Sequence, residues 1–302
     1  MSVFDWLGET ADRVRSDGVD GLRTSAREFR VGVARRAQWL YDSGEPVYER
    51  DWDLLVVLDA CRFDLFTEVA DEYDYVEGYE PYESPASLSA RWMRLTFAPE
   101  YDDEVARTVY VNGNPGSADN APDPERFLYL DDVWEYAWDD ERGTILPEPL
   151  TDRAIALGRE YDPDRMIVHY MQPHYPMVPE PFEETDGRTG RNVWDVLREG
   201  EADRDEVWRR YRGNLQYVMD RLPQLLNNVD AEEVVITADH GNLLGEWGLY
   251  GHFGKVPHPA LRRVPWARAT ATDTAEYEPE LTPPDRSTDR AVETKLRDLG
   301  YV

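Results

Sequence analysis

The stretch DLLVVLDA, residues 53–60, decides the fold of this chain. Its centre, Leu54 to Leu58, is apolar at every position and does not alternate with polar residues, which predicts a strand buried on both faces. Such strands are typical of parallel sheets that helices cover on both sides. Asp59 follows directly, at the carboxyl end of the strand, where ligand-binding side chains lie in open α/β sheets.

The rest of the chain alternates between strand and helix patterns. Further strands are predicted at 74–79, 108–113, 127–133, 165–171 and 232–239. Helical periodicity is predicted at 86–97, 148–160 and 193–228, the last interrupted by the acidic GEADRDE. This alternation predicts an α/β fold with a mostly parallel central sheet between helices. A polar, Pro-rich loop is expected at 267–290 and a closing helix at 289–302.

Residues 1–50 are predicted to form an N-terminal helical segment, and 51–302 the catalytic domain. Leu22, Phe29 and Val33 fall near one stripe of this segment, with arginines beside it. The favoured interpretation is a helix that covers the sheet; the alternative is peripheral contact with a membrane surface or a partner. No apolar run reaches the length of a transmembrane segment.

The composition is strongly acidic, with 62 Asp and Glu against 33 Lys and Arg and a net charge of −29. The charge is spread along the chain, which predicts an acidic surface adapted to a saline cytosol and a halophilic archaeal source. Nucleic acid is excluded as a partner because binding it needs a basic face. No signal peptide is visible, and the single cysteine, Cys61, is expected to pack, so a cytoplasmic protein is predicted.

Two predicted strands end in aspartate, and one of these is followed at once by histidine. Asp59 ends the first, and Asp239 with His240 ends the strand at 232–239. The carboxyl ends of parallel strands meet at one edge, so these three side chains predict a metal site. The five histidines also gather into two short segments after predicted strands, HYMQPH and ADHGNLLGEWGLYGHFGKVPH.

These segments resemble the motifs of the sulfatase and alkaline-phosphatase superfamily. The first is a strand followed by Asp59, Arg62 and Asp64; the second is Asp239-His240-Gly, then Gly-Glu, then Gly-His252. MQPHYP (171–176) and the terminal KLRDLGYV are also similar to family segments. The resemblance implies an alkaline-phosphatase-like fold and a hydrolase or transferase of phosphate or sulfate esters. Its substrate would be a small molecule, a glycan or a lipid ester.

The resemblance also implies roles for particular residues. Asp59, Asp239 and His240 would bind one divalent cation, and Zn²⁺, Mn²⁺, Mg²⁺ and Ca²⁺ all stay open. His174 and His252 would contact the transferred anion or the leaving group. Lys255, three residues after His252, is either a surface lysine or a point charge on the transferred anion. Gln172 stands where the family has an acid that serves a second metal, so a single metal is favoured.

The family attacks with a metal-bound hydroxyl at a helix N-terminus, which points to YESPASLSARWMRLTF, residues 82–97. Ser89 is the first candidate and also a metal ligand; Ser87 is the second, and Ser84 is the remaining serine. The sequence lacks the Cys-x-Pro-x-Arg motif of true sulfatases, which favours phosphorus over sulfur. The rival interpretation is a binding protein that keeps the fold without turnover.

Overall fold

Five parallel strands form the centre of a seven-stranded sheet in a computed structural model that describes residues 3–36, 44–120, 123–182, 185 and 191–284. The sheet order is β2-β11-β8-β1-β7-β3-β4. The strands are β1 (Leu54–Leu58), β2 (Gly78–Glu83), β3 (Thr108–Asn112), β4 (Tyr129–Asp132), β7 (Arg165–Tyr170), β8 (Ala231–Thr237) and β11 (Arg263–Ala271). The predicted α/β class and five of the six predicted strands are confirmed.

The central strand β1 is buried at every residue, as its unbroken apolar run predicts. It pairs in parallel with β7 on one side and with β8 on the other. Val57 lies opposite His169 of β7 and Thr237 of β8, so the three strands end at nearly the same level. This register brings the residues that follow each strand to one edge of the sheet.

The prediction of a strand at 74–79 is wrong in position, because the strand in this region, β2, spans Gly78–Glu83. The preceding aromatic residues face a helix instead of a neighbouring strand: the hydroxyl of Tyr75 donates to the backbone oxygen of Met219 over 2.7 Å, and that of Tyr73 donates to Asp220 over 2.9 Å. Aromatic residues that favour strands therefore pack against a helix here, outside the sheet. The local sequence pattern does not distinguish this use from a place in a strand.

The antiparallel strand β11 overlaps the loop predicted at 267–290, so that loop begins later than expected. Pro265 lies inside β11 opposite Pro81 of β2, the outermost strand of the sheet. A proline cannot donate a ladder hydrogen bond, so a proline within a segment argues against a strand from sequence alone. Here the carbonyl oxygen of Pro265 accepts from the Thr237 hydroxyl over 2.7 Å.

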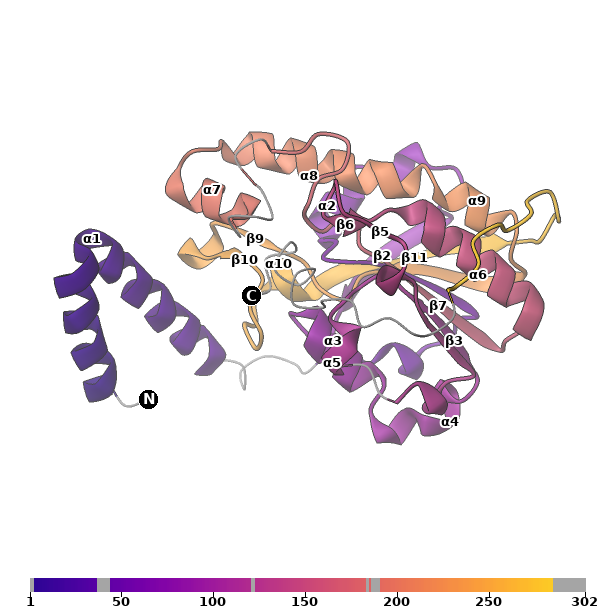
Figure 1. Cartoon of the computed structure of the whole chain (residues 1–302), viewed down its shortest axis with the longest axis horizontal. Coiled ribbons are helices and arrows are strands. Elements are labelled where there is room, and N and C mark those ends of the chain that lie inside the picture. Colours follow the sequence, from indigo (N-terminus) through magenta and orange to yellow (C-terminus); the bar gives the residue numbers. More distant parts are fainter. Residues whose placement is uncertain (1–2, 37–43, 121–122, 183–184, 186–190, 285–302) are drawn as a thin grey trace.

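Helices cover both faces of the sheet, with α8 and α9 on one side and α3 and α4 on the other (Figure 1). The principal helices are α3 (Ser89–Thr96), α6 (Pro147–Tyr161), α7 (Val193–Glu199), α8 (Arg204–Met219) and α9 (Leu222–Leu226). The short elements are α2 (Phe63–Thr67), α4 (Asp102–Val105), α5 (Ser117–Asn120), α10 (Pro259–Arg262), β5 (Trp138–Asp139), β6 (Thr144–Ile145), β9 (Leu243–Leu244) and β10 (Tyr250–Gly251). The predicted break after α7 falls at Gly200, which ends the helix with φ 76°.

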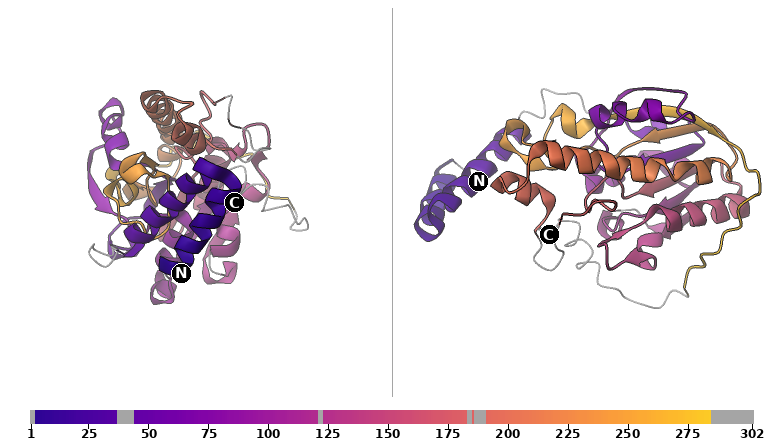
Figure 2. Two further views of the ribbon diagram at one scale, coloured as in Figure 1. Left: turned by 90° about the vertical axis from the view of Figure 1, so that its left-hand side faces the viewer. Right: turned by 90° about the horizontal axis from the view of Figure 1, so that it is seen from above.

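The N-terminal helix α1 (Val3–Arg36) bends at Gly18 and stands to one side of the sheet (Figures 1 and 2). The expectation that it covers the sheet is wrong. Val31 instead packs in a small cluster with Leu243, Leu249, Val256 and Leu261. The predicted closing helix lies outside the described residues, and the boundary at residue 50 stays a prediction.

Candidate active site

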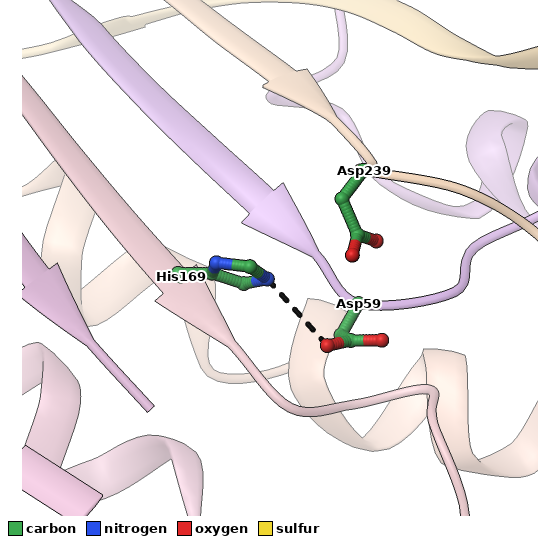
Figure 3. Close-up of side chains that lie close together, drawn as sticks. All are labelled: Asp59, His169 and Asp239. Carbon is green, nitrogen blue, oxygen red and sulfur yellow. Dashed lines mark ion pairs between the residues drawn. The ribbon is translucent and has the colours of Figure 1, made fainter. Parts of the chain in front are cut away.

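The side chains of Asp59 and Asp239 lie close together at the ends of β1 and β8, with Asp239 pointing toward Asp59 (Figure 3). Both are fully buried. The backbone N–H groups of Ala60 and His240 donate to Asp239 Oδ1 over 3.0 and 2.8 Å. Ala60 adopts φ 62°, a left-handed turn that directs its N–H at the neighbouring strand's carboxylate. Pairing of β1 with β8 therefore builds this part of the site.

Each carboxylate keeps one oxygen without a hydrogen-bond partner among the described residues, Asp59 Oδ1 and Asp239 Oδ2. His240 Nε2 lies 3.8 Å from the first of these oxygens and 3.4 Å from the second. Burying two carboxylates without compensating positive charge is costly. Oxygen and imidazole donors gathered in this way suit a divalent cation, so Asp59, Asp239 and His240 fit the metal that their sequence motif implies.

The three candidate serines have different surroundings. Ser89 Oγ lies 3.0 Å from His240 Nε2 and 3.4 Å from Asp59 Oδ2, at the start of α3. The Ser87 hydroxyl donates to the backbone oxygen of Phe253 over 2.8 Å, and the Ser84 hydroxyl donates to the backbone oxygen of Asp239 over 2.5 Å. Only Ser89, among these three, directs its hydroxyl at the carboxylate and imidazole groups.

Three histidine rings form a cluster beside Ser89. The centroid of His252 lies 4.6 Å from that of His240 and 5.3 Å from that of His174. In each ring Nδ1 faces an oxygen that can only accept: Gly241 O for His240, Tyr175 O for His174 and Asn242 Oδ1 for His252. Nδ1 therefore carries the proton and donates, which leaves the lone pair on Nε2. The fold thus selects one tautomer for all three rings.

Burial sets the charge state of this cluster. It lowers the pKa of His174, and it lowers that of His252 well below its ordinary value with help from the neighbouring His240 and His174. Burial by itself would raise the pKa of Asp59, but His169, His174 and His240 hold that pKa below its usual range. At neutral pH the site therefore contains ionised Asp59 and neutral rings of His174 and His252.

His169 belongs to the same group, although sequence reasoning assigned it no role. Asp59, His169 and Asp239 each offer one ligand atom, and these atoms lie within 4.8 Å of one another. His169 Nε2 lies 3.6 Å from Asp59 Oδ2 and has no hydrogen-bond partner in the described part of the chain. The only signal in the sequence was its place in the strand predicted at 165–171; its position opposite Val57 of β1 follows from the strand register.

The tautomer of His169 follows from the residues behind it. The amide nitrogen of Asn112 donates to Asp132 over 2.7 Å, so its oxygen accepts, and the Tyr110 hydroxyl donates to that oxygen over 3.0 Å. The same hydroxyl must then accept from His169 Nδ1, 3.0 Å away. The lone pair of His169 Nε2 is left facing the carboxylates, where it can serve as a cation ligand.

Asn114 is a second residue that the sequence reasoning missed. It is fully buried, and its amide nitrogen donates to Asp59 Oδ2 over 2.5 Å. Its oxygen accepts from the N–H of Gly116 over 2.7 Å, which orients the amide. Asn114 directly follows the strand predicted at 108–113. This position was the only signal in the sequence that Asn114 could reach the site. It fixes the direction of the Asp59 carboxylate.

Three residues of the two sequence motifs form ion pairs that link the loops around the site, and they do not enter it: Arg62, Asp64 and Glu246. Arg62 contacts Asp64 over 2.6 Å and Glu246 over 2.8 Å, and these carboxylates raise the pKa of Arg62 against the opposing effect of burial. Cys61 is buried, and burial raises the pKa of its thiol. Gln172 is buried and donates to Ile145 O over 2.9 Å.

Lys255 is exposed and lines a hollow with Ser87 and Arg91. The predicted residues Asp59, Asp239, His240, Ser89, His174 and His252 therefore come together at one edge of the sheet, while Ser87 and Lys255 lie beside them. The catalytic and ligand roles of all these residues stay predictions.

Comparison with solved structures gives matches of low sequence identity. Lipooligosaccharide phosphoethanolamine transferase A of Neisseria meningitidis, an integral membrane protein, matches with a TM-score of 0.51 and 15% identity over 91% of this chain and 60% of its own length. Its soluble domain matches with a TM-score of 0.49 and 17% identity over 74% and 77%. A protein described as a sulfatase from Bacteroides thetaiotaomicron matches with a TM-score of 0.44 and 11% identity over 72% and 64%.

No family model and no curated protein matches the chain. Together with the strand order, the match at a TM-score of 0.51 confirms the predicted fold class, a mostly parallel sheet between helices. The chain spans 60% of the length of that integral membrane protein. None of the described helices has both the length and the apolar character that crossing a membrane requires.

Proposed function

We propose that the chain is a metal-dependent enzyme that transfers a phosphoryl-type group from an ester, with Ser89 as the nucleophile. One observation carries this proposal. The Ser89 hydroxyl lies 3.0 Å from His240 Nε2 and 3.4 Å from Asp59 Oδ2, beside carboxylate oxygens that have no hydrogen-bond partner among the described residues. This arrangement places a hydroxyl, a base and uncompensated negative charge in one buried site.

Asp59, Asp239, His240 and Ser89 would hold the divalent cation. When bound, it would lower the pKa of the serine hydroxyl and neutralise charge on the transferred group. The residues accommodate Zn²⁺, Mn²⁺, Mg²⁺ or Ca²⁺, and a single tightly held ion is the favoured stoichiometry.

The protein groups have separate tasks in this mechanism. The Ser89 oxygen attacks phosphorus, the bond from phosphorus to the leaving oxygen breaks, and a phosphoserine forms, while the proton that the Ser89 hydroxyl loses passes to the leaving oxygen. When the incoming water or alcohol attacks the phosphoserine, the bond from phosphorus to the Ser89 oxygen breaks, and the Nε2 lone pair of His174 or His252 accepts the proton of the attacking oxygen. The ring that has taken up the proton donates to the phosphoryl oxygens until it returns the proton to the Ser89 oxygen. Neutral rings at neutral pH suit this task, because a ring that is already protonated cannot accept.

Phosphate esters are favoured over sulfate esters because Ser89 is an unmodified serine and the sequence lacks the formylglycine motif. The final acceptor decides between a hydrolase, which uses water, and a transferase, which uses an alcohol. The competing hypothesis, a binding protein without turnover, predicts that metal binds but no ester is cleaved.

Turnover of 4-nitrophenyl phosphate, bis(4-nitrophenyl) phosphate and 4-nitrophenyl sulfate, with metal analysis of the same samples, tests the proposal. Ser89→Ala should reduce turnover by about a thousandfold or more, because it removes the nucleophile. Ser87→Ala is the matched control, a loss of one hydroxyl two residues away. It should retain turnover within roughly tenfold, since it loses only a neutral hydrogen bond to Phe253. Equal losses in both variants, or full activity in Ser89→Ala, would exclude Ser89 as the nucleophile.

A lipid-directed phospho-alcohol transferase is the second candidate, and the exposed surface of α1 favours it. Val19, Leu22, Phe29 and Val33 are 65%, 53%, 50% and 48% exposed. On a helix these positions fall on one stripe. The exposed Arg30 lies beside the stripe. Although the chain as a whole is acidic, this surface combines apolar side chains with positive charge, which is the combination that binds a membrane surface.

Sedimentation with phosphatidylglycerol vesicles tests this membrane contact. Leu22→Ser combined with Phe29→Ser should abolish co-sedimentation, because these side chains supply much of the apolar area of the stripe. The matched control is Leu128→Ser, a change at an exposed leucine of the catalytic body. If the double variant sediments with vesicles as well as the control does, α1 is not the contact surface.

A further inference from the structure

The N-terminal helix α1 meets the catalytic body at the loop that carries His252 (Figures 1 and 2). Residues 242–261 are called the His252 loop below. Val31 of α1 is 8% exposed. It packs in a small cluster with four buried apolar residues of the loop: Leu243, Leu249, Val256 and Leu261. This cluster is distinct from the core around the sheet, so a residue from the other end of the chain completes the apolar packing of the loop.

The His252 loop depends on side-chain packing because its regular backbone structure is short. Its strands β9 and β10 pair at two positions. A two-stranded ribbon of this kind is not stable by itself and needs an apolar face packed against another element. Trp194 of α7 lies beside Gly251 of the loop, and Val31 supplies a second support from α1. Loss of the α1 contact should therefore loosen the loop without unfolding the catalytic body.

The residues of the cluster lie on both sides of His252 in the chain. Leu243 directly follows Asn242, whose Oδ1 accepts from His252 Nδ1 over 2.8 Å. Val256 lies four residues after His252. The cluster therefore holds the backbone next to the hydrogen-bond partner of the ring and also the backbone that bears the ring. Because Nδ1 is bound to Asn242, this packing sets the direction in which the Nε2 lone pair points.

Arg27 adds a second contact from α1, one turn before Val31. Its guanidinium carbon lies 5.1 Å from the centroid of the Phe253 ring, a cation–π contact. Burial and the nearby Arg198 lower the pKa of Arg27, as expected for a guanidinium that is partly removed from water. The backbone oxygen of Phe253 accepts from the Ser87 hydroxyl over 2.8 Å, so Phe253 connects α1 with the chain just before α3.

We infer that α1 positions His252 for the proposed reaction, with Val31 and Arg27 as the positioning residues. Both act through the His252 loop and not on the reacting groups. The inference rests on the proposed function for the task of His252, and it makes α1 a working part of the site. Phe29 and Val33 of the exposed stripe are each two positions from Val31, and helix positions two apart face different sides. One helix can therefore hold the loop and still present its stripe to a membrane.

Kinetics of the metal-loaded, full-length protein with a 4-nitrophenyl ester, without vesicles, test this role. Val31→Ala should lower kcat about tenfold and change KM by less than about twofold, because a displaced His252 is missed mainly in the transition state. Metal affinity in a chelator competition should change by less than about twofold, since Asp59 and Asp239 follow strands of the main sheet. Val14→Ala is the matched control, the same change at a 39% exposed position of α1 before its bend, and should keep the wild-type kcat.

Arg27→Gln is a second variant that opens no cavity between α1 and the loop. It should lower kcat about threefold, because the loop loses the cation–π contact at Phe253. Arg15→Gln is its control, the same change at an exposed arginine that pairs with Asp12. A wild-type kcat in both Val31→Ala and Arg27→Gln would overturn the inference. So would a loss of metal affinity in step with kcat, because the defect would then be general.

Hydrogen–deuterium exchange with mass spectrometry measures the loop without turnover. In Val31→Ala the amides of residues 243–256 should exchange about tenfold faster or more, while those of β1 and β8 keep wild-type rates. Val14→Ala should leave both sets unchanged. Faster exchange of the loop with an unchanged kcat would overturn the positioning role.

The two readouts separate this inference from the proposed function. If the loop exchanges faster in Val31→Ala but the wild type cleaves no ester, the hold of α1 on the loop stands and the proposed function fails. If the wild type cleaves esters and Ser89→Ala does not, but the loop exchanges alike in Val31→Ala and the wild type, the inference is refuted and the proposed function stands.

Discussion

Replacing Asp239 by Asn should change the stability of the protein in opposite directions with and without metal. Asp59 Oδ1 and Asp239 Oδ2 are both buried and lack a hydrogen-bond partner among the described residues. Without metal, Asp239→Asn removes one of two neighbouring negative charges and adds an amide N–H₂ donor near Asp59 Oδ1. We expect the metal-free variant to be more stable than the wild type by about 2 kcal/mol.

The size of the thermal shifts follows from chain length. With an unfolding entropy of about 2.1 cal/mol/K per residue, 2 kcal/mol corresponds to a Tm increase of about 3 °C for 302 residues. A divalent cation at a hundred times its Kd stabilises the wild type by about 2.7 kcal/mol, or about 4 °C. The variant should gain almost nothing from metal, so the order of the two Tm values reverses when metal is added.

Calorimetric melting with and without a chelator measures all four Tm values. Asp64→Asn is the control, because it removes the same charge from a half-exposed carboxylate that pairs with Arg62 at the rim of the site. It should leave the metal-induced shift intact. A metal-free Asp239→Asn protein that melts below the metal-free wild type, or one that keeps the full metal shift, would refute the reasoning.

Three further predictions concern residues around the site. His169→Phe should weaken metal binding about 10- to 100-fold in a chelator competition, because the ring loses Nε2 beside Asp59; unchanged affinity would show that the ring only packs. Asn114→Leu should lower the free energy of unfolding in urea by about 1–3 kcal/mol, because Asp59 Oδ2 loses a donor. Burial lowers the pKa of His258, which caps α10 by accepting from Ala260 N–H over 3.0 Å. As the pH falls, His258 is therefore protonated in the unfolded chain before it is protonated in the folded protein. Below about pH 6.5 the free energy of unfolding of the wild type should fall by up to about 1 kcal/mol relative to that of His258→Asn. Parallel pH profiles of the two unfolding free energies would contradict this.

The sequence alone determined the sheet and the part of the site that follows its strands. An apolar run such as Leu54–Leu58 is a local property, because a strand buried on both faces must be apolar at each position. Parallel strands end at one edge, so Asp59, Asp239 and His240 could be placed together without coordinates. The acidic composition could likewise be read directly, and the halophilic source and cytoplasmic location inferred from the sequence stay predictions.

Only the tertiary structure decided which neighbouring side chains complete the site. Ser87 and Ser89 are alike in sequence, but the Ser87 hydroxyl faces Phe253 O and the Ser89 hydroxyl faces His240 Nε2. They differ because α3 starts between them and because distant parts of the chain supply both partners. His169 and Asn114 joined the site through strand register and side-chain hydrogen bonds across the sheet. The position of α1 was decided in the same way, by the small cluster around Val31 that no local pattern predicts. Contacts between residues far apart in the chain depend on the whole packing arrangement, and periodicity carries no information about them.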